Sequence, residues 1–139
     1  MSKVVRFGVS LPAELIERFD KHIDSKGYRT SSEAIRDIMR ERLVEEEWES
    51  DSGEVVGTVT IVYDHHTREL SSLLTDLQHE HHEEIICSTH IHLDAHNCLE
   101  VIMVKGSGAR VRKIADLLVS TRGVKHGKLV CTTTGKNLL

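Results

Sequence analysis

The chain has 139 residues, enough for one domain or two small ones. Its 18 basic and 22 acidic residues give a formal net charge of −4, which argues against a nucleic-acid binder that works by bulk charge. No apolar run approaches the length of a membrane-spanning helix and no apolar signal region follows Met1, so we expect a cytoplasmic protein with no membrane association. Three cysteines at irregular spacing do not predict a disulfide framework. Histidine is unusually frequent, with ten in the chain, and they concentrate between His65 and His96.

The charge is distributed unevenly along the chain. Residues 1–45 are close to neutral, whereas the acidic excess lies in residues 46–139. The acidic stretch 45–54 ends in serine and glycine and interrupts the apolar periodicity, which is typical of a helix end that runs into a linker. We therefore predict an N-terminal domain, a linker and a C-terminal domain, over residues 1–48, 49–53 and 54–139.

The N-terminal domain is predicted to fold as one strand followed by two helices. Apolar residues alternate over residues 5–11, as in a half-buried strand. Pro12 suits the first position of a helix, and Gly27 suits a left-handed cap at the end of that helix. Residues 30–33 match a capping box, which opens the second helix.

The single N-terminal strand predicts pairing between two copies of the chain. A lone strand leaves its backbone groups unpaired, so two copies are expected to form an antiparallel ribbon. Such a ribbon fits the major groove of DNA, with Arg6, Gly8 and Ser10 pointing outward for base contacts. The alternative is a dimerisation module without a ligand. The start of the second helix offers free N–H groups beside basic side chains, so the predicted phosphate clamp consists of Lys26, Arg29, Ser31 and Ser32.

Residues 54–139 alternate between strand and helix in the order β-α-β-β-α-β. This order is a split βαβ of the ferredoxin-like type, so the predicted fold class is α+β. Its second helix is expected to be capped by Gly123. The fold by itself does not name a ligand. The predicted strands cover residues 55–63, 85–93, 98–104 and 129–134, and the predicted helices begin near Leu70 and Val111.

The second and third of these strands are predicted to bring two imidazoles and a thiol together. Side chains alternate between the faces of a strand, so a turn centred on Ala95 places His92 opposite Cys98. The same register places His90 opposite Glu100, whose carboxylate is expected to support the ligands. Imidazole and thiolate together select borderline-soft transition metals, and donors from two adjacent strands favour a planar ion, Ni²⁺ or Cu²⁺ before Zn²⁺. The missing fourth ligand is expected at the end of the preceding helix, from His79, His81 or His82.

The remaining cysteines and histidines are expected to have no primary ligand role. Cys87 and Cys131 fit buried or half-buried strand positions and are predicted to be small core residues. The remaining histidines are predicted to occupy surface or secondary positions, namely His22, His65, His66, His96 and His126.

Several segments of the sequence carry a resemblance to a known family. They are RFGVSL (6–11), GY (27–28), SEAIRD (32–37), QHEHH (78–82), HIH (90–92), NCLE (97–100) and RGVKHG (122–127). Over essentially its whole length the chain resembles the NikR family of nickel-responsive transcriptional regulators. The resemblance implies a ribbon-helix-helix DNA-binding domain joined to an ACT-type domain, in a homotetramer that is a dimer of dimers.

The resemblance also implies a nickel site. His90, His92 and Cys98 match three ligands of one subunit in a square-planar site, with one Ni(II) per subunit. His79 matches the fourth ligand, which a neighbouring subunit donates.

Further residues match other sites of the family. Arg6, Gly8 and Ser10 fall on the base-reading positions, although Gly8 stands where some members have threonine. The resemblance associates His65 and His66 with weaker, secondary metal binding. The positions that help to hold a structural cation near the DNA-binding domain match Glu33 and Asp37.

The combined prediction is a nickel-responsive, DNA-binding regulator. It is expected to repress nickel-uptake genes from palindromic half-sites, with nickel and operator strengthening each other's binding. The alternatives are a DNA-binding regulator that responds to copper, cobalt, zinc or an organic ligand, and a metal storage or delivery protein with no DNA role. An enzyme is not expected, because no Ser/His/Asp or paired-carboxylate arrangement stands out.

Overall fold

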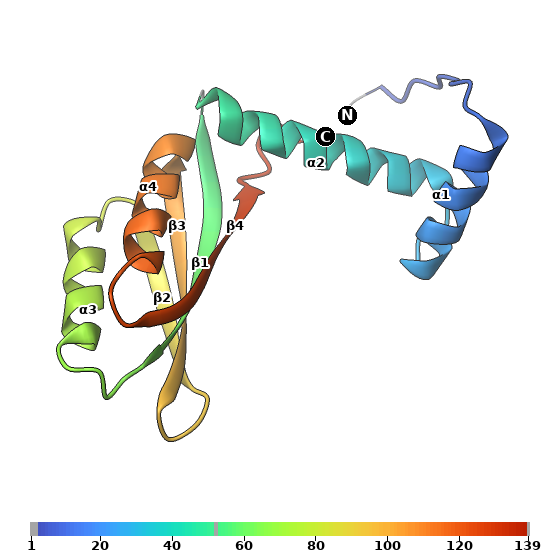
Figure 1. The fold of residues 1–139 in the computed structure, drawn as a ribbon. Helices are drawn as coiled ribbons and strands as arrows, with labels where there is room; N and C mark the ends of the chain where they lie inside the picture. Colours follow the sequence, from blue (N-terminus) through green and yellow to red (C-terminus); the bar gives the residue numbers. More distant parts are fainter. Residues whose placement is uncertain (1–2, 52, 139) are drawn as a thin grey trace. The chain divides into compact units, whose positions relative to one another are not determined.

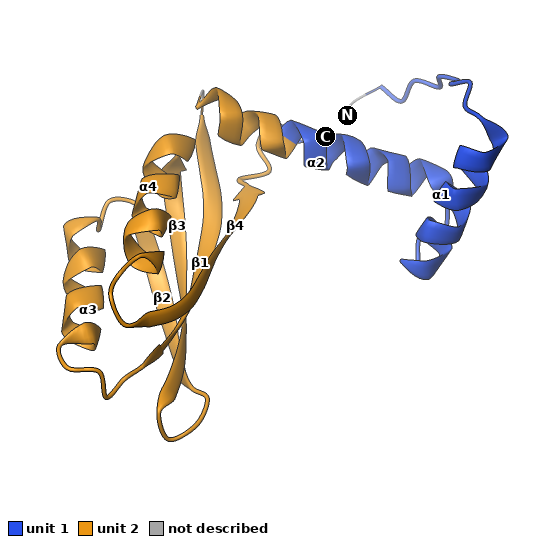
Figure 2. Ribbon diagram, in the orientation of Figure 1, with its two compact units in different colours: residues 1–43, 137–139 blue, residues 44–136 orange. Residues whose placement is uncertain are grey.

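The computed structural model describes residues 3–51 and 53–138. The chain divides into two compact units, the first formed by residues 1–43 with 137–139 and the second by residues 44–136 (Figure 2). The placement of a domain boundary after residue 48 stays a prediction. Among the described residues, no helix is both long enough and apolar enough to cross a membrane.

The first unit contains α1 (Ala13–Ser25) and the first part of α2 (Ser31–Ser50) (Figure 1). The predicted capping box is confirmed, because the Glu33 backbone N–H donates to the Thr30 hydroxyl at 3.2 Å. Gly27 has a φ of 80°, a left-handed conformation that glycine adopts without strain. The N–H groups of Gly27 and Tyr28 bond back to carbonyls of the last turn of α1, as in a Schellman cap.

The predicted N-terminal strand is not formed within a single chain. Residues 3–11 have no strand assignment. Their apolar side chains are open to solvent, with Val5 at 72%, Phe7 at 68% and Val9 at 68% exposure. The physical reason is that a strand needs a hydrogen-bonded neighbour, and within residues 3–51 and 53–138 no strand pairs with this segment.

The second unit confirms the predicted α+β fold. It has four strands in the order β2-β3-β1-β4, and each neighbouring pair is antiparallel. This is the strand order of a ferredoxin-like βαββαβ domain. The elements are β1 (Glu54–Asp64), α3 (Leu70–Glu80), β2 (Ile85–His92), β3 (Asn97–Ser107), α4 (Gly108–Val119) and β4 (Val124–Thr133).

One face of the sheet is covered by α3 and α4, and the other face is open (Figure 1). Buried and half-buried residues alternate strictly along β1, and the buried ones form the core with α4 and α3. The open face carries Ile91, Met103 and Val130, which are 48%, 38% and 51% exposed.

The prediction that Cys87 and Cys131 are core residues is wrong, because both are exposed. Cys87 lies on the open face, where its thiol contacts Met103 Sδ at 3.5 Å.

The end of α2 is anchored in the second unit. Trp48 is 3% exposed, and its Nε1–H donates to the Thr132 carbonyl at 2.8 Å. A Cβ at Gly108 would lie 2.9 Å from the Trp48 carbonyl oxygen, so the start of α4 needs a glycine at this close approach. The helix continues to Ser50, into the segment predicted as linker.

The predicted capping role of Gly123 is wrong. The α4 helix ends at Val119, with Ser120 as its C-cap residue, three positions before the glycine. Gly123 instead has a φ of 101° in the turn that leads into β4. A Cβ there would lie 2.9 Å from Leu70 Cδ2, so this turn has two reasons to require glycine.

Candidate metal centre

The hairpin of β2 and β3 confirms the register predicted for the metal ligands. His92 pairs with Cys98, and His90 pairs with Glu100. The Asp94 carboxylate fixes the connecting turn, because it accepts hydrogen bonds from the backbone N–H groups of His96 and Asn97, each at 2.8 Å. The side-chain amide of Asn97 also donates to this carboxylate, at 2.8 Å. The amide bond first, and then the two backbone bonds, lower the pKa of Asp94 to about 2.

The Cys98 thiol lies at the centre of a small donor cluster. Its side chain is fully buried, and Sγ lies 3.4 Å from His92 Nδ1 and 3.2 Å from His65 Nδ1. The three ligand atoms lie within 4.8 Å of one another. A thiol with two imidazoles fits a borderline-soft transition metal and does not fit Mg²⁺ or Ca²⁺, which prefer oxygen ligands.

Burial and nearby carboxylates both act on this thiol. Burial raises the pKa of Cys98 above its ordinary value, and the carboxylates of Asp64, Asp94 and Glu100 raise it further. Without a cation the thiol therefore keeps its proton. The same negative surroundings favour a divalent cation, and a metal bound here would displace that proton.

His90 is adjacent to the cluster but belongs to a different hydrogen-bond network. Its Nδ1 lies 3.3 Å from the Tyr63 hydroxyl, which donates to Glu100 Oε2 at 3.1 Å. Gln78 Nε2 donates to the other oxygen of Glu100 at 2.9 Å. Burial, followed by the charge of Glu100, raises the pKa of Tyr63 and keeps its hydroxyl protonated. Glu100 therefore reaches His90 through Tyr63, and it links β3 to the last turn of α3 through Gln78.

The structure does not bring His79 into the cluster of its own chain. His79 is exposed in the last turn of α3, one residue before the helix ends. His81 and His82 follow in the turn, and His82 Nδ1 lies 3.1 Å from the His79 carbonyl oxygen. Among the described residues, the three-ligand cluster contains none of these three histidines.

The predicted DNA-contacting residues all lie at the surface of the first unit. Arg6, Gly8 and Ser10 are exposed in the segment 3–11, and Ser31 and Ser32 begin α2. Lys26 and Arg29 are exposed immediately before that helix.

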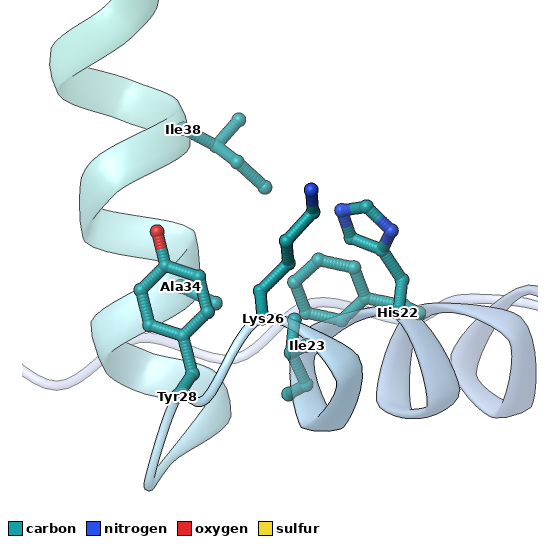
Figure 3. Close-up of a pocket in the computed structure, with 7 residues that line it drawn as sticks. His22, Ile23, Lys26, Tyr28, Ala34 and Ile38 are labelled. Carbon is teal, nitrogen blue, oxygen red and sulfur yellow. The ribbon is translucent and has the colours of Figure 1, made fainter.

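A pocket of about 310 Å³ opens between α1 and α2, and Figure 3 shows the residues that line it, Phe19, His22, Ile23, Lys26, Tyr28, Ala34 and Ile38.

Comparisons with known proteins place the chain in a family. The family described as NikR C terminal nickel binding domain matches residues 56–132, and the family described as ribbon-helix-helix protein, copG family, matches residues 5–46. The chain belongs to the NikR family. Its relatives include proteins described as nickel-responsive regulators from Geotalea uraniireducens, 57% identical, and Thermococcus onnurineus, 54% identical, each aligned over 99% of both chains.

A solved structure shares part of the fold of this NikR chain. An uncharacterized protein from Thermotoga maritima matches 58% of this chain over 100% of its own length, with a TM-score of 0.52 and 16% identity. This likeness concerns the fold alone. The predicted fold class, a ribbon-helix-helix domain followed by an α+β metal-binding domain, is confirmed by the family matches and by the sheet described above.

Reasoning from the residues alone left His65 of this NikR chain outside the ligand cluster, whereas the resemblance associates it with secondary metal binding. It was predicted as a surface or secondary position, whereas its Nδ1 is the nitrogen nearest to the Cys98 thiol among the contacts described above. A signal was present in the sequence, because Tyr63 and His65 share a face by strand parity and Tyr63 lies opposite Cys98 in the β1–β3 ladder. Finding it required the order of the strands, since β1 and β3 are far apart in the sequence.

The two residues that match the family's structural cation site have other contacts here. The Asp37 carboxylate accepts a hydrogen bond from the Tyr28 hydroxyl at 2.9 Å and lies 3.4 Å from Arg40 Nη1. Glu33 lies one helical turn earlier on α2, and within the described part of the chain neither carboxylate joins a cluster of three metal-binding groups. Their role in cation binding stays a prediction.

Proposed function

We propose that this NikR-family chain is a cytoplasmic, nickel-responsive repressor that binds operator DNA in a sequence-specific way and controls nickel-uptake genes. The observation that carries the proposal is the buried Cys98 thiol, which has imidazole nitrogens at 3.2 and 3.4 Å in a domain of the nickel-binding family. Family membership indicates a transcription regulator and not an enzyme. Residues 1–48 would form the DNA-binding module, and residues 54–139 the metal-sensing module.

We propose His90, His92 and Cys98 as the nickel ligands of one chain, with His79 from a neighbouring chain as the fourth and one Ni(II) per subunit. The β2–β3 register supports the first three, because it places them on one face of adjacent strands. The exposed position of His79 at the end of α3 supports donation to another copy. The Tyr63 hydroxyl contacts Nδ1 of His90 and not the other ring nitrogen. A metal-binding histidine is commonly oriented in this way, by a hydrogen bond to the ring nitrogen that does not bind the metal.

The DNA-binding role rests on a dimer of the first unit. Within the described residues segment 3–11 has no strand partner, and the apolar side chains of its own Phe7 and Val9 are exposed. A second copy would supply both the hydrogen bonds and the apolar cover. The ribbon would then present Arg6, Gly8 and Ser10 to base edges in the major groove of palindromic half-sites, with the N-terminus of α2 on a phosphate.

A homotetramer, built as a dimer of dimers, would use the open face of the sheet. Three large apolar residues on this face, Ile91, Met103 and Val130, are each more than a third exposed. A contiguous apolar surface on a sheet is typical of a protein–protein interface. Packing two sensor domains face to face would cover these side chains.

Nickel-dependent operator binding is the direct test of the proposed function. A gel-shift assay with the upstream region of the gene, with and without Ni²⁺, compares the wild type with His92→Ala and Cys98→Ala. Coupling energies of this kind are typically 1–3 kcal/mol, so Ni²⁺ is expected to raise operator affinity of the wild type about 5–150-fold. Cys131→Ala is the matched control, because Cys131 is an exposed thiol on β4.

Each outcome of this assay bears on the proposal. The wild type and Cys131→Ala are expected to respond to Ni²⁺, and the two ligand variants are expected to lose the response. A full nickel response in Cys98→Ala would show that the proposed site is not the sensor. Coupling is reciprocal, so operator DNA must also raise the Ni²⁺ affinity of the wild type by the same factor, which calorimetric titration measures.

A further inference from the structure

Strand β4 begins with an irregularity in its pairing that the proposed function does not use. In the β1–β4 ladder, Val62 pairs with His126. The next residue of β1, Tyr63, pairs with Val124, so Lys125 is an extra residue between the two pairs, as in a β-bulge. Bulges redirect side chains and are common beside functional sites, so the direction of the Lys125 side chain matters.

The Lys125 side chain reaches the turn of the metal-binding hairpin. Its Nζ donates to Asn97 Oδ1 at 2.6 Å, and Asn97 is the first residue of β3 and the neighbour of Cys98. Asn97 pairs with Asp64 at the end of β1, so the lysine side chain spans this end of β1. The hydrogen bond therefore joins β4 to β3, two strands that are not adjacent in the sheet.

Several hydrogen bonds of this turn converge on Asn97. Its carbonyl accepts from the backbone N–H groups of Leu93 at 2.8 Å and Asp94 at 3.3 Å. Its side-chain amide and its backbone N–H both donate to the Asp94 carboxylate at 2.8 Å. An ammonium group can only donate, so it fixes which end of the asparagine side chain is the oxygen. Lys125 therefore keeps the amide of Asn97 directed at Asp94.

This turn sets the separation of two of the proposed nickel ligands. His92 ends β2, Cys98 follows Asn97, and the Cys98 Sγ lies 3.4 Å from His92 Nδ1 across the hairpin. We propose that Lys125 is a positioning residue of the nickel site, which acts through Asn97 to hold the turn between His92 and Cys98. The inference rests on the proposed nickel ligands. A turn that is ordered before the metal arrives loses less conformational freedom on binding, which strengthens metal affinity.

The positive charge of Lys125 by itself would have the opposite effect on the metal. An ammonium group near the site repels a divalent cation, so its removal would raise Ni²⁺ affinity if charge were the only contribution. Loss of an outer partner that orients metal ligands instead lowers metal affinity, by about 10–100-fold. The direction of the change in Ni²⁺ affinity of Lys125→Met therefore separates a positioning role from an electrostatic one.

Competition with a chelator measures the Ni²⁺ affinity of the full chain, and the thiolate-to-nickel charge-transfer band reports the occupied site. We expect Lys125→Met to lower Ni²⁺ affinity about 10-fold, and Lys125→Arg to restore most of the loss because a guanidinium also donates N–H groups. Asn97→Ala should cause a similar loss, and combining it with Lys125→Met should cause no further loss, since both changes remove one contact. Lys113→Met removes the same charge from an exposed position on α4 and should change the affinity by less than about twofold.

Hydrogen exchange in the metal-free chain gives a second measurement that does not depend on nickel. The amides of His96 and Asn97 donate to the Asp94 carboxylate, so they should exchange faster in Lys125→Met than in the wild type. Lys125→Arg should return them to the slower exchange of the wild type. Amides in the middle of β1, which pairs with strands on both sides, should exchange at the same rate in all three proteins.

The outcomes separate this inference from the proposed function. Unchanged or higher Ni²⁺ affinity in Lys125→Met, or an equal loss in Lys113→Met, would overturn the inference. Unchanged exchange of the turn amides, or an equal acceleration in β1, would overturn it as well. Unchanged Ni²⁺ affinity in His92→Ala would instead count against the proposed nickel ligands, and the exchange rates of the metal-free chain would still decide whether Lys125 holds the turn.

Discussion

Trp48 provides a sharp test of how α2 is attached to the sensor sheet. The side chain is 3% exposed, and its indole N–H donates to the carbonyl of Thr132 in β4 at 2.8 Å. The ring also lies where a Cβ at Gly57 would meet it at 3.2 Å, and the guanidinium carbon of Arg112 lies 5.4 Å from the ring centroid. The residue thus contacts two strands and α4.

The expected cost of Trp48→Phe follows from these contacts. Phenylalanine cannot donate to the Thr132 carbonyl, and a buried acceptor that loses its partner costs about 1–3 kcal/mol. The smaller ring also removes on the order of 40 Å² of apolar contact, worth about 1 kcal/mol at about 25 cal/mol per Å². We therefore expect Trp48→Phe to lower the free energy of unfolding by about 2–4 kcal/mol, and Trp48→Ala by about 3–5 kcal/mol.

Urea unfolding followed by far-ultraviolet circular dichroism measures this cost. The chain has a single tryptophan, so fluorescence reports the wild type but cannot follow the variants. All proteins are compared at one concentration, because association contributes to apparent stability. Glu46→Gln, an exposed change on the same helix, should lie within about 0.5 kcal/mol of the wild type. A change below about 1 kcal/mol for Trp48→Phe would refute the anchoring role of the indole.

Three further predictions concern DNA contacts, packing and the metal. Arg6→Ala should reduce operator affinity by about 1–3 kcal/mol in a gel shift, because Arg6 is expected to contact a base, and should leave Ni²⁺ affinity unchanged. An unchanged operator affinity would show that Arg6 does not contact a base. Gly127→Ala should destabilise the fold by about 1–3 kcal/mol in urea, because the new Cβ would lie 2.6 Å from Val119 Cγ2; equal stability would show that α4 shifts freely. Removal of metal by a chelator should lower operator affinity, and Ni²⁺ but not Mg²⁺ should restore it, whereas recovery with Mg²⁺ would contradict a thiol-containing sensor site.

The order of the secondary-structure elements could be predicted because each one follows a local rule. The strand predicted over residues 55–63 is confirmed as β1, and a capping box located the start of α2. The register of the β2–β3 hairpin also followed from parity, which placed His92 opposite Cys98. Element ends were harder to predict, since Gly123 serves a turn and not the helix that it was expected to cap.

Burial and contacts between distant strands could not be predicted from local sequence patterns. Cys87 was predicted to be a core residue from its apolar strand, but it is exposed. The packing of α3 and α4 determines which face of the sheet is covered, and the periodicity of a strand does not show which face that is. His65 was missed for a related reason, since its contact with Cys98 joins residues that are 33 positions apart. Pairs of this kind need the strand order before parity can be applied to them.

Three features of the described residues support the proposal that copies of this chain associate. Segment 3–11 has no strand assignment, the open sheet face exposes apolar side chains, and His79 lies outside the cluster of its own chain. The Gln78 side chain, next to His79, is bonded through Glu100 and Tyr63 to His90, so the end of α3 and the ligand strand are mechanically joined. In the proposed nickel site, a metal bound to His90 would therefore be linked through this network to the helix that carries His79.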